Sequence, residues 1–330
     1  MSQREPQLVQ RSVESEFGGG YDDLGGSMNS QNEQEMLRSF VGSLNPRTEA
    51  VSALPTFSIV MPSYNQAQFI ERSILSVLNQ DYPNIELIVM DGGSTDGTVE
   101  IIKKYSKYIA HWVSEKDDGQ SHALNKGFAR ATGEVMGWMN SDDLYLPGSI
   151  SRAAEALRTG PQRSVVFGDW WSIDVDDKLS EVWPAFDFSL GHFIYEGFTH
   201  NSQAMFWTKA AHDRFGQFDL NLHLTMDYDL ILRLGRNEGV SGFHRLDMAL
   251  ACFRRYEGQK TSGFDRTVQQ EHIRIATNLG YPDKFRWIGS SKRLFYRGRR
   301  MYWYGKRNGA GYVLKKATGS LRNRLLRSSK

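Results

Sequence analysis

Apolar segments with two different periods alternate along the chain between residues 56 and 167. Short apolar runs predict five buried strands, at Phe57–Met61, Ile85–Met90, Ile109–Val113, Val135–Met139 and Val165–Phe167. Between them, apolar residues three or four apart predict helices, which begin near Asn65, Thr98, Ser121 and Pro147. Because strands alternate with helices, we expect an α/β fold with a mainly parallel sheet and helices on both faces. Pro62 is expected to end the first strand.

The pattern changes on either side of this region. Residues 1–54 are rich in Gln, Ser, Glu and Gly, so we expect a mostly disordered arm with one short helix near Gln31–Phe40. After Asp169, two aromatic segments flank residues 174–178 and predict a hairpin, and the spacing of Met226–Leu234 predicts a strong helix. We therefore divide the chain into an arm (1–54), two halves of one α/β domain (55–170 and 171–283) and a tail (284–330).

Polar and glycine-rich clusters follow the first four predicted strands. These clusters occupy residues 62–65, 91–97, 115–119 and 140–143. In open α/β sheets, ligands bind outside the carboxyl ends of the strands, so we expect the four clusters to form one site. Each cluster taken alone could equally be a tight turn or a helix cap.

Acidic side chains dominate this predicted edge, namely Asp91, Asp96, Glu115, Asp117, Asp118, Asp142 and Asp143. A hard divalent cation would relieve their repulsion, and carboxylate oxygens suit Mg²⁺ or Mn²⁺. Because Mg²⁺ is commonly shared with substrate phosphates, we expect the ligand to be a diphosphate, such as that of a nucleotide. The chain lacks a P-loop, and it lacks G-x-G-x-x-G after its first strand, so these two phosphate-binding motifs are excluded.

Two stretches together resemble the nucleotide-binding part of family 2 glycosyltransferases. The first is FSIVMPSYNQAQFIERSILSVLNQDYPNIELIVMDGGSTDGT, and the second is WVSEKDDGQSHALNKGFARATGEVMGWMNSDDLYLPGS. The resemblance runs from about Thr56 to Tyr256 and is closest to the bacterial branch that builds O-antigen and exopolysaccharide repeats. It implies a GT-A fold, which is Rossmann-like, with the nucleotide-sugar bound by residues 55–170 and the acceptor by residues 171–283.

The resemblance also implies roles on the donor side. The residues that would contact the nucleotide or line its pocket are Pro62, Ser63, Tyr64, Asp91 and Asp117. Asn140, Ser141 and Asp142 match the D-x-D motif of the family, with Asn in place of the first Asp. Asp142 would then bind the metal that bridges the diphosphate, and Asp143 would assist.

On the acceptor side, residues 226–234 resemble the family's E-D-y-D-L-w-L-R-L helix, with Met226 in place of Glu. Asp227 matches the general base of the family, and an inverting transfer needs one carboxylate to take the proton of the acceptor hydroxyl. The alternative is that Asp227 is a first-turn carboxylate favoured by the helix dipole. Asp229 is two residues away and is expected to face elsewhere on the helix.

The charge of the chain is strongly divided. Residues 284–330 contain fifteen of the 40 Lys and Arg residues and no Asp or Glu, so the rest of the chain is net negative. Aromatic residues, among them Phe295 and Trp303, are interleaved with these cations. This composition is typical of a helix at a membrane surface. A tail that is solvated or docked on the domain is the alternative, and nucleic acid is a less favoured partner.

The remaining composition bears on the compartment. A single cysteine, Cys252, excludes an intramolecular disulfide framework and fits a reducing environment. No run approaches 18 consecutive apolar residues, and the first ten residues lack the apolar core of a secretory signal. We expect a cytoplasmic protein that is peripheral on the inner face of the plasma membrane.

Three functional hypotheses follow. The first is an inverting, metal-dependent glycosyltransferase that moves a sugar from a nucleoside-diphosphate-sugar, most commonly a UDP-sugar in this family, to a glycan or lipid-linked glycan acceptor. The second is a sugar nucleotidyltransferase, although its usual Gly-rich loop and basic residue are missing after the first strand. The third is a non-catalytic module that binds a nucleotide or glycan at a membrane.

Overall fold

A computed structural model describes residues 30–45, 50–160, 162–196, 200–260, 266–281 and 287–328. Residues 30–304 form one compact unit, and residues 305–328 belong to another. The predicted site residues all lie in the first unit.

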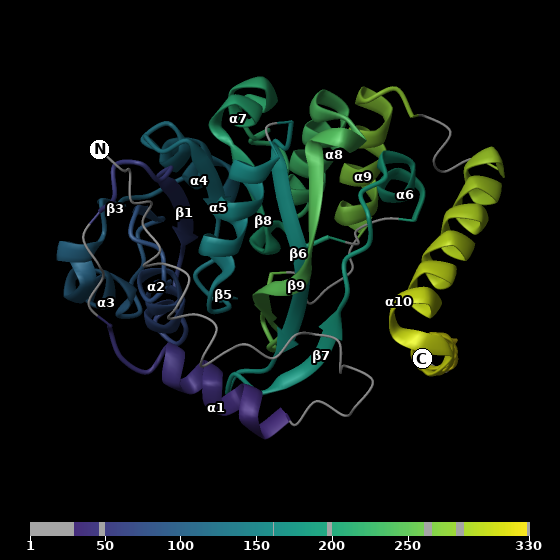
Figure 1. Ribbon diagram of the computed structural model, residues 1–330, viewed down its shortest axis with the longest axis horizontal. Coiled ribbons are helices and arrows are strands. Elements are labelled where there is room, and N and C mark those ends of the chain that lie inside the picture. The colour runs from purple at the N-terminus through teal and green to yellow at the C-terminus, as the bar shows by residue number, and fades with distance from the viewer. Residues whose placement is uncertain are drawn as a thin grey trace, which may run out of the picture. The chain divides into compact units, whose positions relative to one another are not determined.

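The strands of the described residues form one mixed sheet in the order β3-β2-β1-β4-β8-β6-β9-β5, with β7 paired to β6 (Figure 1). The strands are β1 (Phe57–Ser63), β2 (Ile85–Asp91), β3 (His111–Ser114), β4 (Val135–Trp138), β5 (Leu144–Tyr145), β6 (Val165–Ile173), β7 (Leu179–Trp183), β8 (Met205–Thr208) and β9 (Phe243–Arg254). β1 pairs in parallel with β2 and β4, and β2 pairs in parallel with β3. The expected mainly parallel arrangement is therefore found where the nucleotide half was predicted.

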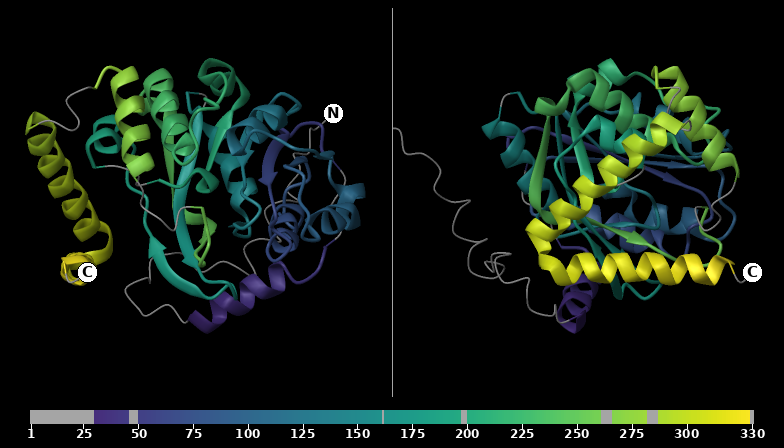
Figure 2. Two further views of the ribbon diagram at one scale, coloured as in Figure 1. Left: turned by 180° about the vertical axis from the view of Figure 1, so that it is seen from behind. Right: turned by 90° about the vertical axis from the view of Figure 1, so that its right-hand side faces the viewer.

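Helices cover both faces of the sheet (Figures 1 and 2). The helices of the described residues are α1 (Ser30–Phe40), α2 (Ile70–Leu78), α3 (Thr98–Tyr105), α4 (Gln120–Phe128), α5 (Ser149–Thr159), α6 (Leu190–Glu196), α7 (Lys209–Phe215), α8 (Met226–Glu238), α9 (Arg266–Asn278) and α10 (Trp287–Ser328). Successive strand residues point to opposite faces. Ile59 accordingly belongs to a core with α1, α2, α3 and α5, whereas Val60 belongs to a core with α4, α7 and α8.

The sequence predicts that Pro62 ends the first strand, and this prediction is wrong. β1 continues to Ser63, and Pro62 is in register with Met90 of β2. β4 pairs with β1 only as far as Val60. Beyond Val60, β1 therefore has no partner strand on that side, and a residue without an N–H is tolerated there.

Two predicted helix starts also differ from the structure. α2 begins at Ile70 rather than near Asn65, whose φ of 50° takes it out of a helical path. α5 begins at Ser149, after Gly148 with φ 77°, so Pro147 precedes the helix. In both cases a left-handed residue turns the chain before the helix starts.

The short helix expected near residues 31–40 is confirmed as α1, which lies beside β7 in Figures 1 and 2. Leu37 is fully buried and Val41 is 4% exposed, so α1 packs against the domain. The Asn79 side-chain amide fastens its end by donating to the carbonyl of Ser43 at 2.8 Å. The packed part of the chain thus begins well before residue 55, and residues 1–29 of the expected arm lie outside the described residues.

The described part of the tail, residues 287–328, is helical, as expected, with a kink at Gly309, whose φ is 77° and ψ 168°. No helix among the described residues has the length and apolarity needed to cross a membrane.

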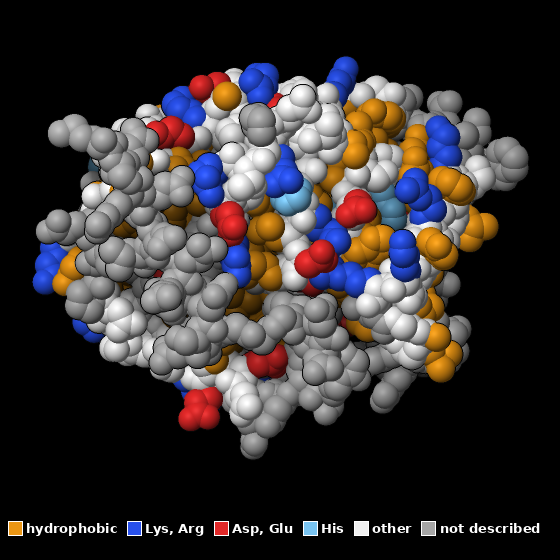
Figure 3. Space-filling view, viewed as in Figure 1, with side chains coloured by type: hydrophobic (Ala, Val, Ile, Leu, Met, Phe, Trp, Pro, Cys, Tyr) orange, Lys and Arg blue, Asp and Glu red, His pale blue; other side chains and the backbone are white. Residues whose placement is uncertain are grey.

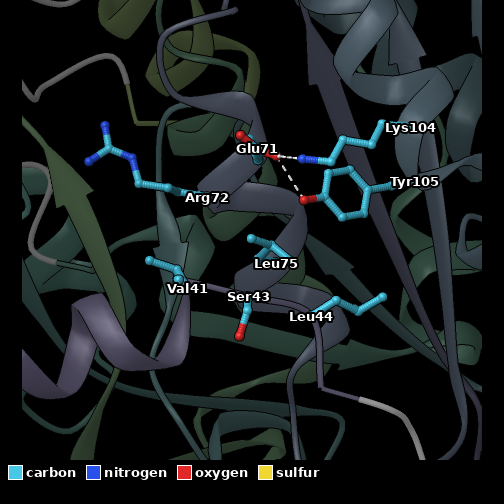
Figure 4. A pocket seen from close by; sticks show the side chains of 9 residues that line it. Val41, Ser43, Leu44, Glu71, Arg72, Leu75, Lys104 and Tyr105 are labelled. Atoms are coloured by element: carbon cyan, nitrogen blue, oxygen red, sulfur yellow. Dashed lines mark hydrogen bonds and ion pairs between the residues drawn. The ribbon is translucent and has the colours of Figure 1, made fainter.

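A hollow of about 500 Å³ lies between the end of α1 and helices α2 and α3 (Figure 4). Among the residues that line this hollow, Glu71 accepts hydrogen bonds from Lys104 at 2.6 Å and from Tyr105 at 2.8 Å. Glu71, Lys104 and Tyr105 are therefore hydrogen-bonded to one another. None of the predicted site residues lines this hollow.

Candidate active site

Asp91 ends β2 and organises the loop that follows it. The side chain is 2% exposed, and its Oδ2 accepts hydrogen bonds from the backbone N–H of Ser94 at 2.9 Å and from the Ser114 hydroxyl at 2.6 Å. The Ser94 hydroxyl donates to the other oxygen at 2.5 Å. Because a carboxylate with several donors is well satisfied, Asp91 fixes the glycine-rich loop beside β1 rather than standing free.

The end of β1 carries the other predicted nucleotide contacts. Pro62 and Ser63 are buried, whereas Tyr64 is 63% exposed. The carbonyl of Ser63 accepts a hydrogen bond from Gly92 N at 2.8 Å, which joins the β1 and β2 loops. Among the described residues, the buried hydroxyl of Ser63 has no hydrogen-bond partner. Such a group is normally satisfied, so it is a candidate ligand contact.

Asn65 was predicted to start a helix. In the structure it reinforces the same junction of the β1 and β2 loops. Its side-chain oxygen accepts from Thr95 N at 3.0 Å, and its backbone N–H donates to the Ser94 hydroxyl at 2.7 Å. The carboxylate of Asp96 accepts a hydrogen bond from Ala67 N at 2.9 Å. The two loops are thus cross-linked by short polar side chains, and the left-handed Asn65 makes this possible.

Asp117 reaches this junction from the third strand end. Its Oδ1 accepts a hydrogen bond from Gly119 N at 2.8 Å. A Cβ placed on Gly92 would lie 2.9 Å from Oδ2 of Asp117, so the missing side chain of Gly92 lets the two loops approach. The structure therefore brings Asp117 beside the loop of Asp91, as predicted.

Asn140 is held by hydrogen bonds at both ends of its amide. Its oxygen accepts from Trp138 Nε1 at 2.8 Å and from Gln120 Nε2 at 2.9 Å, and its nitrogen donates to Oδ2 of Asp143 at 3.1 Å. An Asp at position 140 would place two carboxylates in contact. The Asn in this D-x-D position therefore suits the buried Asp143 behind it.

That Asp143 assists at a metal stays a prediction, and within the protein both of its carboxylate oxygens already accept hydrogen bonds. It is fully buried, and while Asn140 donates to one oxygen, the backbone N–H of Arg254 donates to the other at 2.8 Å. Burial and the neighbouring Asp142 raise the pKa of its carboxyl well above the usual range. Asp143 joins the turn before β5 to the end of β9.

Asp142 lies half-buried beside Ser141, which is buried. Oδ2 of Asp142 accepts a hydrogen bond from the Tyr256 hydroxyl at 2.9 Å, and that hydroxyl also accepts from Gln66 Nε2 at 3.3 Å. Burial raises the pKa of the Asp142 carboxyl. Desolvation outweighs the hydrogen bond from Tyr256 and the charge of Arg254, both of which lower this pKa.

The turn at residues 140–143 offers a divalent cation one carboxylate, that of Asp142. Among the described residues there is no group of three or more His, Cys, Asp or Glu side chains that could hold a metal ion by themselves. A single carboxylate with substrate phosphates is nevertheless a known way of binding Mg²⁺. Asp142 has this capacity, because among the described residues a side chain donates to only one of its carboxylate oxygens.

Arg254 stabilises the turn that contains Asp142, a role that the sequence did not indicate. It is fully buried, and its Nε donates to the carbonyl of Asp142 at 2.8 Å. Its guanidinium also forms an ion pair with Asp177 at 2.6 Å and donates to the carbonyl of Asp174 at 2.7 Å. Arg254 thereby connects the Asp142 turn with the turn between β6 and β7.

Asp227 lies half-buried in the first turn of α8, and its Oδ1 accepts a hydrogen bond from Tyr228 N at 2.7 Å. Burial raises the pKa of its carboxyl to about 6, while the charge of Lys260 lowers it and that of Glu271 raises it. A carboxylate with a pKa near neutrality is suited to proton transfer. Asp229, as predicted, faces elsewhere, since it pairs with Arg233 at 2.9 Å.

Glu271 of α9 positions the start of α8, a feature that was missed from sequence. Its carboxylate accepts from the backbone N–H groups of His223 at 2.8 Å and Thr225 at 3.0 Å, and from the Thr225 hydroxyl at 2.8 Å. These bonds lower the pKa of the Glu271 carboxyl. Thr225 directly precedes α8, so Glu271 fixes the backbone from which Asp227 projects.

Lys260 connects the donor and acceptor halves of the site. Its ammonium donates to Oε1 of Gln120 at 3.4 Å, and Gln120 in turn donates to Asn140. Burial lowers the pKa of the Lys260 ammonium, while the charges of Glu271, Asp227 and Asp117 raise it. The structure thus brings the clusters of the first four strands and the base candidate of α8 into one neighbourhood.

The comparisons with known proteins agree with this arrangement. The model of the family described as "Glycosyl transferase family 2" matches residues 58–215. An uncharacterized glycosyltransferase of Mycobacterium tuberculosis (strain CDC 1551 / Oshkosh) is 31% identical over 188 residues, which cover 56% of this chain and 70% of that protein.

Solved structures have a similar fold. S. aureus TarS 1–349 in complex with UDP-GlcNAc aligns with a TM-score of 0.58 at 20% identity, over 76% of this chain and 74% of that chain. The mannosyltransferase PcManGT from Pyrobaculum calidifontis, in complex with GDP-Man and Mn²⁺, aligns with a TM-score of 0.51 at 16% identity, over 88% of this chain and 87% of that chain. The chain described here therefore belongs to glycosyl transferase family 2 and is a glycosyltransferase with the GT-A fold.

Proposed function

We propose that this glycosyltransferase is inverting and metal-dependent. It moves a sugar from a nucleoside-diphosphate-sugar to a hydroxyl of a glycan acceptor in the synthesis of cell-surface polysaccharide, such as O-antigen or exopolysaccharide. The observation that carries the proposal is Asp227, a half-buried carboxylate whose pKa is raised to about 6, in the same neighbourhood as Asp142. A base and a cation-binding carboxylate are the two groups that the reaction requires.

The donor is proposed to be a UDP-sugar, bound at the junction of the β1 and β2 loops. The Ser63 hydroxyl is unpartnered among the described residues, and Tyr64 offers an exposed ring to a base. Asp91 and Asp117 hold the two loops that would surround the ribose. The complex of TarS with UDP-GlcNAc supports this choice, since its fold is similar.

Asp142 would hold the metal together with the diphosphate of the donor. A divalent cation bound there, Mn²⁺ or Mg²⁺, would neutralise negative charge on the departing diphosphate. Asn140 and Asp143 would set the position of Asp142 through their hydrogen bonds, and Arg254 would hold its backbone carbonyl. The complex of PcManGT with Mn²⁺ supports a metal at such a site.

Asp227 would take the proton of the acceptor hydroxyl as that oxygen attacks the anomeric carbon. The bond to the diphosphate breaks as the new glycosidic bond forms, so one displacement inverts the configuration and no enzyme-bound sugar is needed. We propose that the acceptor glycan is carried on a polyprenyl lipid at the inner face of the plasma membrane, which the basic, aromatic tail would favour.

Asp142→Asn is expected to remove the effect of metal on donor binding. Calorimetric titration of the wild type with UDP should give tighter binding in Mn²⁺ than in EDTA, and the variant should bind UDP equally in both. Asp213→Asn, on the exposed side of α7 where Asp213 pairs with Lys209, should behave as wild type. If the variant retained the full gain from Mn²⁺, the metal site would be elsewhere.

The rate of transfer is expected to fall below about pH 6. Asp227 must be ionised to accept a proton, so kcat/KM should drop about tenfold per pH unit beneath its pKa of about 6. Lys260→Met should move this limb to higher pH, because Lys260 favours the charged carboxylate. Rates measured from pH 4.5 to 8 test this, and an unchanged rate at pH 5 would contradict the role of Asp227.

A further inference from the structure

The first turns of α10 are attached to the catalytic domain by one side of the helix. Tyr296 stacks on Tyr195 of α6 with ring centroids 5.8 Å apart and planes 3° apart. Arg300 forms an ion pair with Glu196 at 2.6 Å, and Tyr304 is only 7% exposed. These α10 residues are four apart in sequence and therefore lie on one side of the helix.

The opposite side of these turns carries large apolar side chains in contact with solvent. Leu294 is 71% exposed, Phe295 61% and Tyr302 75%. Positions 295 and 302 are seven residues apart, so they lie on the same side of an α-helix. Figure 3 shows hydrophobic and basic side chains together on the surface over α10. Isolated exposed apolar residues are normal, but such a group on one helix marks an interaction surface.

The positive charge around the outward side of α10 indicates an anionic partner. Arg299 is exposed in the same turns, and residues 284–330 contain no Asp or Glu. Acidic residues on the domain are used to fasten the helix, since Glu196, whose side chain is 3% exposed, binds Arg300 and also Arg297 at 3.5 Å. Exposed aromatics flanked by cations complement the headgroups and the acyl boundary of an anionic bilayer.

We propose that the outward side of α10 between Leu294 and Tyr302 binds the surface of an anionic lipid bilayer and holds the catalytic domain there. The contacts with α6, and the Arg245 guanidinium 5.4 Å from the Trp303 ring, make the part of α10 up to Tyr304 a fixed part of the domain rather than a free tether. This inference deepens the proposed membrane association and is independent of the proposed chemistry.

The test uses the full chain and sedimentation with lipid vesicles. We expect binding to vesicles of phosphatidylglycerol and phosphatidylcholine, weaker binding in 0.5 M NaCl, and little binding to phosphatidylcholine alone. The triple variant Leu294→Gln, Phe295→Gln, Tyr302→Gln should bind anionic vesicles at least tenfold more weakly. It replaces exposed side chains only, so it should retain the circular dichroism spectrum and the donor-dependent release of nucleotide.

A matched triple variant provides the control. Val51→Gln, Tyr108→Gln and Val240→Gln replace exposed apolar residues elsewhere on the domain and should leave vesicle binding unchanged. Equal loss in both triple variants, or none in either, would overturn the proposal. So would binding of a DNA oligonucleotide that exceeds vesicle binding, or a dimer in gel filtration that the first variant abolishes while vesicles bind neither protein. Loss of nucleotide release without loss of vesicle binding would count against the proposed chemistry alone.

Discussion

Asp227→Asn is expected to lower kcat about 10³-fold, which is the usual effect of removing a general base. The amide has the shape of the carboxylate, and its oxygen can still accept the hydrogen bond from Tyr228 N that Asp227 accepts at 2.7 Å. It cannot take a proton from the acceptor hydroxyl. The loss should therefore appear in the chemical step, while calorimetry should find the affinity for UDP in Mn²⁺ unchanged.

Asp229→Asn is the matched control on the same helix. Asp229 pairs with Arg233 at 2.9 Å and contacts no predicted site residue, so its replacement should lower the melting temperature while kcat stays near the wild-type value. The two variants thus separate catalysis from stability within one turn of α8. A kcat for Asp227→Asn above a tenth of the wild-type value would show that Asp227 is a first-turn carboxylate without a catalytic role.

Arg254→Met is expected to destabilise the protein by about 3 kcal/mol, because breaking a buried ion pair leaves an uncompensated charge. Arg254 is fully buried and binds Asp177 at 2.6 Å. Its loss would also leave the carbonyl of Asp142 without its donor, while the carbonyl of Asp174 would keep only the N–H of Asp177 at 3.2 Å. Asp177 keeps its second partner, Arg72 at 2.6 Å, which limits the effect.

Arg255→Met changes the neighbouring arginine and serves as the control. Arg255 is exposed, with its guanidinium 5.8 Å from the Trp183 ring, so its replacement should cost less than about 1 kcal/mol. Urea unfolding of both variants gives the comparison. Equal stability of the two variants would show that the ion pair beneath the Asp142 turn contributes little.

Much of the fold follows from local pattern, because an apolar run or a helical period is a property of neighbouring residues. α3 begins at Thr98, as predicted, and the hairpin of β6 and β7 was predicted around residues 174–178. Pro62 was misread because its tolerance depends on where β4 stops pairing with β1. Such pairing limits are set by tertiary structure and leave no local signal.

The candidate site was predicted less completely, for a similar reason. Spacing alone placed Asp91, Asp117 and Asp142 at neighbouring strand ends, where the structure has them. It could not indicate which donors satisfy each carboxylate. Arg254 follows Asp143 by 111 residues, yet its backbone N–H donates to an oxygen of that carboxylate.

The central claim is tested most directly by nucleotide release from the purified full chain. UDP-glucose, UDP-galactose, UDP-N-acetylglucosamine, GDP-mannose and dTDP-rhamnose would be supplied in turn, with Mn²⁺ or with EDTA, and free nucleoside diphosphate measured. We predict release from one donor class, a UDP-sugar, that requires Mn²⁺ and is lost in Asp227→Asn. Release that is equal in EDTA, or no binding and no release with any of the five donors, would contradict a metal-dependent transfer from a nucleotide-sugar.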